Sequence, residues 1–198
     1  MATVPLPGYR DGDALPVSAD AAAEALSSAI ESCAEGRPFT LVGFSTGGLV
    51  AHSSARYLEA RDIHPKAVVL IDSFPPSAMT DAALSDVMWQ WSITKGMFWS
   101  ENDGSLTAMA WHLDLFGLKW TPNILEAPLL LIQAADQLPS VPINKWAKEW
   151  PGLTECITTP GSHFGLLTEY VTQTAQTISK LLENVDATIR PLKKGALA

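Results

Sequence analysis

Three kinds of side chain in this sequence could together carry out acyl transfer: a serine, a histidine and a carboxylate. Ser45 lies in the stretch VGFSTGG, directly after an apolar run. A neutral serine hydroxyl is a poor nucleophile near neutral pH, so it needs a base such as imidazole within hydrogen-bonding reach. A carboxylate must then orient the imidazole and stabilise its charged form. Ser45 is therefore our candidate nucleophile.

The surroundings of Ser45 support this role. Gly43, Ser45 and Gly47 form a Gly-x-Ser-x-Gly motif, which indicates a nucleophile only where a strand turns sharply into a helix. The run FTLV precedes the motif and the helical pattern GGLVAHSSARYLEA follows it, so both flanks fit. Neighbours of the serine must lack bulk at so tight a turn. The backbone amides that begin the helix, including that of Thr46, are the predicted donors to an oxyanion.

His163 is the predicted base among four histidines. It lies in the loop TPGSHFGLL after the last predicted strand, at the edge where open α/β sheets place their sites. His52 lies two helical turns beyond the serine and points away from it, so we expect a packing role. We expect His64 to be solvated in a surface loop and His112 to pack within an aromatic segment.

Two aspartates could orient His163, because each follows a predicted strand. Asp72 ends the run VVLIDS, and Asp136 lies in LIQAADQ. Hydrolases with this strand–serine–helix arrangement usually take the acid from the later strand, which favours Asp136. Physical chemistry alone leaves both aspartates open.

The predicted strands and helices alternate along the chain, which indicates a mostly parallel α/β sheet flanked by helices. Short apolar runs, the first three without two-fold alternation, predict buried parallel strands; they are FTLVGF (39–44), KAVVLIDS (66–73), APLLLIQA (127–134) and the weaker TECITTP (154–160). Helical patterns cover 18–34, 47–60 and 166–185, whereas 4–17 is predicted to be a loop. We expect one domain over residues 1–198.

Residues 77–122 form an insertion of roughly helical character that is rich in tryptophan, methionine and phenylalanine. Two interpretations remain open. The insertion could pack its aromatic side chains into the core, as such stripes usually do. Alternatively, it could be a lid that lines an apolar channel.

Composition limits the classes of partner. The net charge of −8 and the lack of a basic run argue against nucleic acid. The sequence contains no apolar stretch long enough to span a membrane and no signal peptide, so we expect a cytoplasmic protein without membrane contact. Cys33 and Cys156 are too few for a disulfide framework or a cysteine zinc site, and we expect both in the core.

Four segments in order resemble the chain-terminating thioesterase domains of modular (type I) polyketide synthases, which have the α/β-hydrolase fold. PLPGYRDGDALP resembles their PxPGYxxGExLP loop, GFSTGGLVAH their GHSxGxxxAx elbow, KAVVLIDSFPP their RGVVLIDxYPP and TPGSHF their xPGDHF. The resemblance extends from Val4 to about Val185. It implies a triad of Ser45, His163 and Asp72, because the family's acid follows the strand after the elbow. Asp136 becomes the fallback.

The resemblance also implies a function. Such a domain takes an acyl chain from the phosphopantetheine arm of an acyl carrier protein, or of the upstream synthase module, and releases it by hydrolysis or macrolactonisation. The substrate would be a long, largely apolar acyl thioester, residues 77–122 would be the lid, and neither metal nor bound cofactor is needed.

The sequence also departs from the family pattern. Phe44 replaces the usual histidine beside the nucleophile, and Ser162 replaces the usual aspartate before His163. The chain starts where the family would already have its first strands and second oxyanion donor, and it lacks the family's N-terminal dimerising helices, so we expect no family-type dimer. Two alternatives remain: a general serine esterase of the same fold using Asp136, and a non-catalytic binding module.

Overall fold

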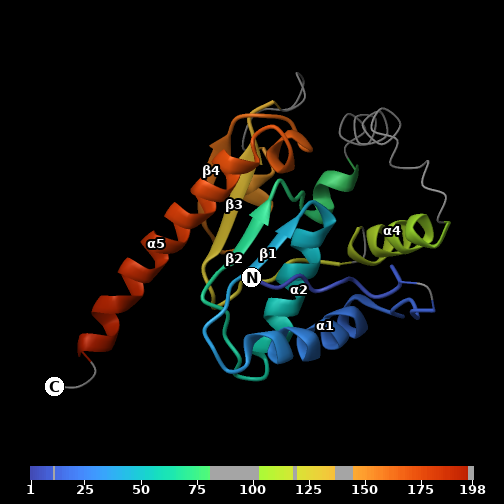
Figure 1. Cartoon of the computed structure of the whole chain (residues 1–198), viewed down its shortest axis with the longest axis horizontal. Coiled ribbons are helices and arrows are strands. Elements are labelled where there is room, and N and C mark those ends of the chain that lie inside the picture. The colour runs from blue at the N-terminus through green and yellow to red at the C-terminus, as the bar shows by residue number, and fades with distance from the viewer. Residues whose placement is uncertain (11, 81–102, 118–119, 137–144, 196–198) are drawn as a thin grey trace.

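The computed structural model describes residues 1–10, 12–80, 103–117, 120–136 and 145–195 of the 198-residue chain. Its centre is a four-stranded, fully parallel sheet in the order β1-β2-β3-β4 (Figure 1). The strands are β1 (Leu41–Phe44), β2 (Val68–Ile71), β3 (Leu129–Ala134) and β4 (Leu153–Thr159). Three of them lie within the predicted apolar runs and β4 begins one residue earlier, so the expectation of a parallel α/β sheet is confirmed.

The burial of each strand follows its place in the sheet. All residues of β2 and β3 are buried, which explains why their sequences show no alternation of apolar and polar residues. β1 and β4 lie at the two edges and are only partly buried. Val42 in β1 is 49% exposed.

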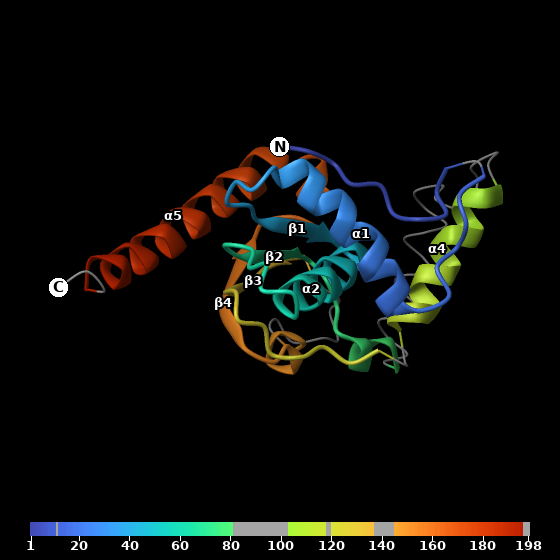
Figure 2. The same ribbon diagram turned by 90° about the horizontal axis from the view of Figure 1, so that it is seen from below.

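Helices cover both faces of the sheet (Figure 2). On one face, α1 (Ala19–Ala34) and α2 (Thr46–Glu59) pack with Val68, Leu70 and other strand residues of the same orientation. On the opposite face, α5 (Val171–Gly195) packs through Leu181 and Val185 on the alternate strand residues. Successive residues of a strand point to opposite faces, so the apolar strands supply both cores.

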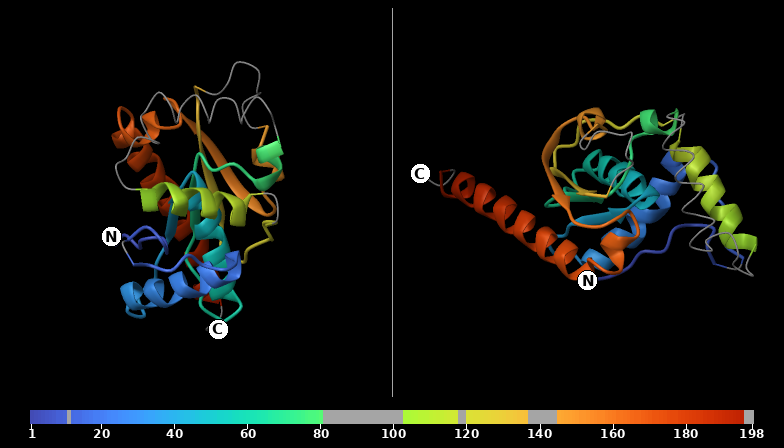
Figure 3. Two further views of the ribbon diagram at one scale, coloured as in Figure 1. Left: turned by 90° about the vertical axis from the view of Figure 1, so that its right-hand side faces the viewer. Right: turned by 90° about the horizontal axis from the view of Figure 1, so that it is seen from above.

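Two helix boundaries differ from the prediction. α5 begins at Val171 rather than at residue 166, because Gly165–Leu167 forms a separate 3-10 turn, η3. The helix also continues to Gly195, ten residues beyond the predicted end, and its C-terminal half extends away from the sheet (Figures 1 and 3). In contrast, α1 begins where predicted, with Ser18 Oγ accepting the amide of Ala21 at 3.1 Å.

Part of the insertion over residues 77–122 is described. It contains the 3-10 turn η1 (Pro76–Thr80) and α4 (Asp103–Phe116), while residues 81–102 and 118–119 lie outside the described residues. Phe116 and Trp120 are buried in the core that α1 and α2 share. These described aromatic side chains therefore follow the packing interpretation; a lid role stays a prediction.

The N-terminal loop of residues 4–17 runs along α4 (Figure 3). We call this segment the strap. Trp111 Nε1 donates to the carbonyl of Pro16 at 2.6 Å, and His112 Nε2 donates to that of Pro7 at 2.9 Å. The ring of Tyr9 stacks on His112, and burial raises the pKa of Tyr9. These hydrogen bonds thus join the strap to α4, although the bonded residues are about a hundred positions apart in sequence.

The expectation for the cysteines was wrong at one position. Cys33 is exposed, because it lies beyond Ile30, the last buried residue of α1. Cys156 is half-buried, burial raises its pKa, and its Sγ donates to Gln133.

None of the described helices combines the length and apolar character needed to cross a bilayer.

Candidate active site

Ser45 occupies a sharp corner between β1 and α2. Its backbone has φ 54° and ψ −126°, a conformation that side-chain-bearing residues rarely adopt. The amide of Ser45 donates to Ile71 O at 2.9 Å, which ties the corner to the end of β2. Thr46 is the first residue of α2, so its amide is among the N-terminal N–H groups of the helix. The strand-to-helix corner expected from the motif is present.

Two glycines make this corner possible. A Cβ on Gly43 would collide with the carbonyl of Gly47, and a Cβ on Gly48 would collide with the side chain of Ser73. A Cβ on Gly47 would meet nothing within 4 Å. The close packing of strand and helix therefore requires Gly43 and Gly48, whereas the last glycine of the motif has free space around it.

His163 and Asp72 form a buried pair. Nδ1 of His163 lies 2.8 Å from Oδ2 of Asp72, and the two side chains are 1% and 2% exposed. The other carboxylate oxygen, Oδ1, accepts the amide of Ala134 at 2.9 Å. An ionised carboxylate only accepts hydrogen bonds, so Nδ1 carries the proton and Nε2 is left as the basic nitrogen.

Backbone contacts also hold Asp72 in place. Asp72 directly follows β2 with φ 44°, and its amide donates to Ile132 O at 2.7 Å. The residue therefore turns across the end of β3, whose Ala134 amide it also binds. This turn brings a carboxylate from the second strand toward the loop after the fourth.

Asp136, the alternative acid, lies differently. Its side chain is exposed, and its backbone amide donates to Gly161 O at 3.1 Å. Asp136 thus joins the end of β3 to the His163 loop through its main chain. In this structure the carboxylate that contacts His163 belongs to Asp72.

Three phenylalanine rings surround the imidazole of His163, and the sequence analysis assigned none of them to the site. The Phe44 ring centroid lies 4.5 Å from that of His163 with an interplanar angle of 32°. Phe74 lies at 6.0 Å with a similar tilt, and Phe164 at 5.0 Å nearly edge-on. The available signal was the position of each phenylalanine close to a candidate residue. Phe44 immediately precedes Ser45, Phe74 follows Asp72 by two positions, and Phe164 immediately follows His163.

Ser45 and His163 are connected in this structure through a neighbouring residue rather than by a hydrogen bond. The hydrogen bonds among the described residues include none between the Ser45 hydroxyl and His163. Phe44, the residue before Ser45, contacts the imidazole face instead. Catalytic hydrogen bonds are often long without substrate, so the arrangement is compatible with a serine–histidine–aspartate relay.

The other histidines have the roles expected of them. His52 is fully buried, and its Nε2 donates to Asn123 O at 3.0 Å. Burial lowers the pKa of His52 to about 4, aided by Arg56 and opposed by that hydrogen bond. His112 is buried against the strap, whereas His64 is at the surface beside Asp62 and Glu126.

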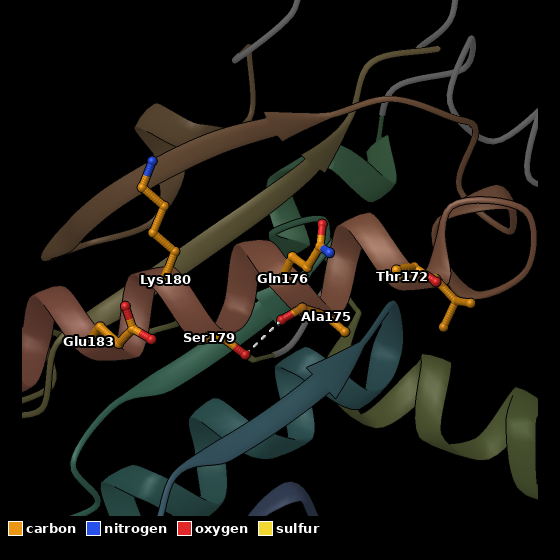
Figure 4. A pocket seen from close by; sticks show the side chains of 7 residues that line it. Thr172, Ala175, Gln176, Ser179, Lys180 and Glu183 are labelled. Atoms are coloured by element: carbon orange, nitrogen blue, oxygen red, sulfur yellow. Dashed lines mark hydrogen bonds between the residues drawn. The ribbon is translucent and has the colours of Figure 1, made fainter.

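An open depression of the surface runs along one side of α5 (Figure 4). It is lined by Val171, Thr172, Ala175, Gln176, Ser179, Lys180 and Glu183. Ser45, Asp72 and His163 are not among these residues, so this depression is not the candidate active site. Among the residues that the structure describes, no group of three His, Cys, Asp or Glu side chains is arranged to hold a metal ion.

A parallel sheet, a serine at a strained strand-to-helix corner and a buried histidine–aspartate pair define the α/β-hydrolase class. Residues 1–87 match the family model of the thioesterase domain. In sequence the chain resembles the thioesterase domains of modular polyketide synthases, and its fold is that of solved thioesterase domains. The expected resemblance and fold class are confirmed.

The curated relatives are polyketide synthases. The chain is 37% identical over 172 residues to the spectinabilin polyketide synthase system protein NorC of Streptomyces orinoci, covering 84% of this chain and 8% of the relative. It is 32% identical over 185 residues to the erythronolide synthase EryA3 of Saccharopolyspora erythraea, covering 90% and 6%. The chain thus spans less than a tenth of the length of these relatives.

Solved structures show the same fold. The NocB thioesterase domain, determined as a covalent complex with a fluorophosphonate nocardicin G analogue, superposes with a TM-score of 0.68 at 19% identity. The match covers 89% of this chain and 80% of that one.

Proposed function

We propose that this chain is a polyketide chain-releasing thioesterase that works through an acyl-serine ester. Ser45 is the nucleophile, His163 the base and Asp72 the residue that orients His163. The observation that carries the proposal is the buried Nδ1–Oδ2 contact of 2.8 Å between His163 and Asp72, at the same sheet edge as the Ser45 corner.

In acylation, Ser45 Oγ bonds to the thioester carbon while its proton passes to Nε2 of His163. The oxyanion that forms is stabilised by the Thr46 amide at the start of α2. The carbon–sulfur bond then breaks, and His163 returns the proton to the leaving thiol. Water gives a free acid in deacylation, whereas a hydroxyl of the acyl chain gives a macrolactone, and Ser45 is regenerated.

The proposed substrate is a long acyl chain carried as a thioester on the phosphopantetheine arm of an acyl carrier protein. The similarity to polyketide synthases and the apolar insertion over 77–122 support this class. We further propose that the chain acts as one domain, with the insertion as its lid, in the cytoplasm. No step requires a metal or a bound cofactor.

The test is intact-protein mass spectrometry after incubation with an acyl-pantetheine thioester. We expect the wild-type protein to gain the mass of the acyl group and release thiol, and Ser45→Ala to do neither. If the wild-type protein gains no acyl mass and releases no thiol, the chain is a non-catalytic binding module. If it turns over simple aryl esters faster than pantetheine thioesters, the general-esterase alternative is correct.

A further inference from the structure

Phe44 contacts His163, the base of the proposed function, and the following inference rests on that function. The Nδ1–Oδ2 hydrogen bond to Asp72 fixes one point of the imidazole. The bond to Cβ and this hydrogen bond both lie on the same side of the ring, and a tilt of the imidazole would turn Nε2 away from the serine. Catalysis needs the base within hydrogen-bonding reach and in the right direction. Contacts with the faces of the ring therefore bear on the direction of Nε2.

Phe44 supplies a constraint of the right kind. Its ring lies 4.5 Å from the imidazole at 32°, close to a stacked arrangement, so the two flat faces oppose rotation. Phe164 closes another side nearly edge-on, at 80° to the imidazole, and also contacts Phe44 at 6.3 Å. With the imidazole only 1% exposed, this packing also keeps water from the ring face.

The place of Phe44 in the sequence adds the connection to the nucleophile. Phe44 is the last residue of β1, and Ser45 follows it at the strained corner. The amide of Ser45 is bonded to Ile71 O, which fixes the peptide link between the two residues. The ring that contacts the imidazole and the hydroxyl of the nucleophile are therefore carried by adjacent residues of the same fixed backbone segment.

We propose that Phe44 is a positioning residue that holds the His163 imidazole in the plane from which Nε2 reaches the Ser45 hydroxyl. Phe44 acts through His163 and takes no part in bond making. A flat ring at position 44 is what matters, so tyrosine or histidine should replace phenylalanine, whereas leucine should not.

The experiment compares Phe44→Leu with Phe44→Tyr, Phe44→His and the matched control Phe39→Leu. Phe39 precedes the opposite end of β1 and packs in the core away from the corner, so its substitution reports a purely structural loss. We expect Phe44→Leu to lower kcat for thioester cleavage about 3- to 10-fold with KM unchanged. Tyrosine and histidine should restore kcat, and Phe39→Leu should leave it near the wild-type value. Phe44→Met replaces the leucine variant if that protein does not fold.

A second readout does not depend on turnover. In the Ser45→Ala background, the proton on His163 Nδ1 is followed by NMR, and its exchange with water is measured. We expect Phe44→Leu to speed this exchange severalfold, because the imidazole gains mobility, and Phe39→Leu to leave it unchanged.

Equal kcat and equal exchange in Phe44→Leu and Phe39→Leu would overturn the proposal. Failure of the proposed function would give a distinct result: the wild-type protein itself would react with neither a thioester nor a fluorophosphonate probe. In that case the exchange measurement alone decides whether Phe44 holds the imidazole.

Discussion

The amide of Ala134 in β3 donates to Oδ1 of Asp72, which follows β2, over 2.9 Å. The second oxygen of the same carboxylate faces the N–H of His163. Both oxygens of Asp72 therefore accept from N–H donors, and neither position tolerates a group that donates.

Asp72→Asn should for this reason cost far more than its small change in size. If the amide NH₂ faces His163, the imidazole is pushed into the wrong tautomer or loses its partner, and if it faces Ala134, two N–H donors oppose each other. We expect kcat to fall about 10³- to 10⁴-fold with the fold retained. Asp136→Asn is the control, because its side chain is exposed, and it should stay within about threefold of wild type. The opposite order of the two variants would assign the acid to Asp136.

The three glycines around the nucleophile should differ sharply in their tolerance of alanine. Gly43→Ala places a Cβ against the backbone of Gly47, and Gly48→Ala places one against the side chain of Ser73. We expect each to lower the free energy of unfolding by about 1–3 kcal/mol. Gly47→Ala fills open space in α2 and should be neutral or stabilising by up to about 1 kcal/mol. Urea unfolding measures all three, and a Gly43→Ala protein as stable as wild type would contradict the described corner.

The buried His52 should make stability depend on pH. Its pKa is lowered in the folded protein from 6.5 to about 4, so the folded state keeps it neutral while the unfolded chain takes up a proton. The stability that this residue contributes is complete above pH 6.5 and is lost as pH falls toward 4. The loss amounts to about 3 kcal/mol at most.

The measurement compares urea unfolding of wild type and His52→Gln between pH 7 and pH 4. The wild-type protein should lose more stability on acidification than the variant does. His64→Gln, at an exposed histidine, should follow the wild-type curve. Parallel curves for all three proteins would mean that His52 does not titrate differently on unfolding.

The strap should depend on its two hydrogen bonds to α4. Trp111→Phe keeps an aromatic ring but removes the N–H that donates to Pro16 O. We expect hydrogen exchange in residues 4–17 to rise about fivefold, equivalent to roughly 1 kcal/mol of local stability. Exchange in α1, which does not share this contact, should be unchanged. No change in the strap would show that the bond contributes nothing measurable.

Much of this fold could be predicted from the sequence. The central strands β2 and β3 are apolar on both faces, and Ser18 marks the start of α1 with a side-chain cap. The start of α5 could not be predicted as well. Leu166 and Leu167 continue the apolar pattern, yet they lie in a 3-10 turn, where Leu166 is buried and Leu167 is 42% exposed. Periodicity alone does not distinguish a turn packed on the core from the first turn of a helix.

The candidate site shows the same limit. Ser45 and His163 carry local signals, a glycine-flanked corner and a loop after the last strand. The choice between Asp72 and Asp136 depended on a resemblance, because no local pattern shows that Asp72 turns across the end of β3. The aromatic enclosure of His163 is likewise a tertiary property, since Phe44, Phe74 and Phe164 come from three separate segments.

Among the described strands, β1 pairs with β2 alone, so one edge of β1 has no described neighbour. Such an edge offers unpaired backbone donors and acceptors to any extended chain that approaches it. An extended segment that pairs there would lengthen the sheet directly beside the strand that leads to Ser45. Strand pairing at this edge and the geometry of the nucleophile corner would then be coupled through the same four residues of β1.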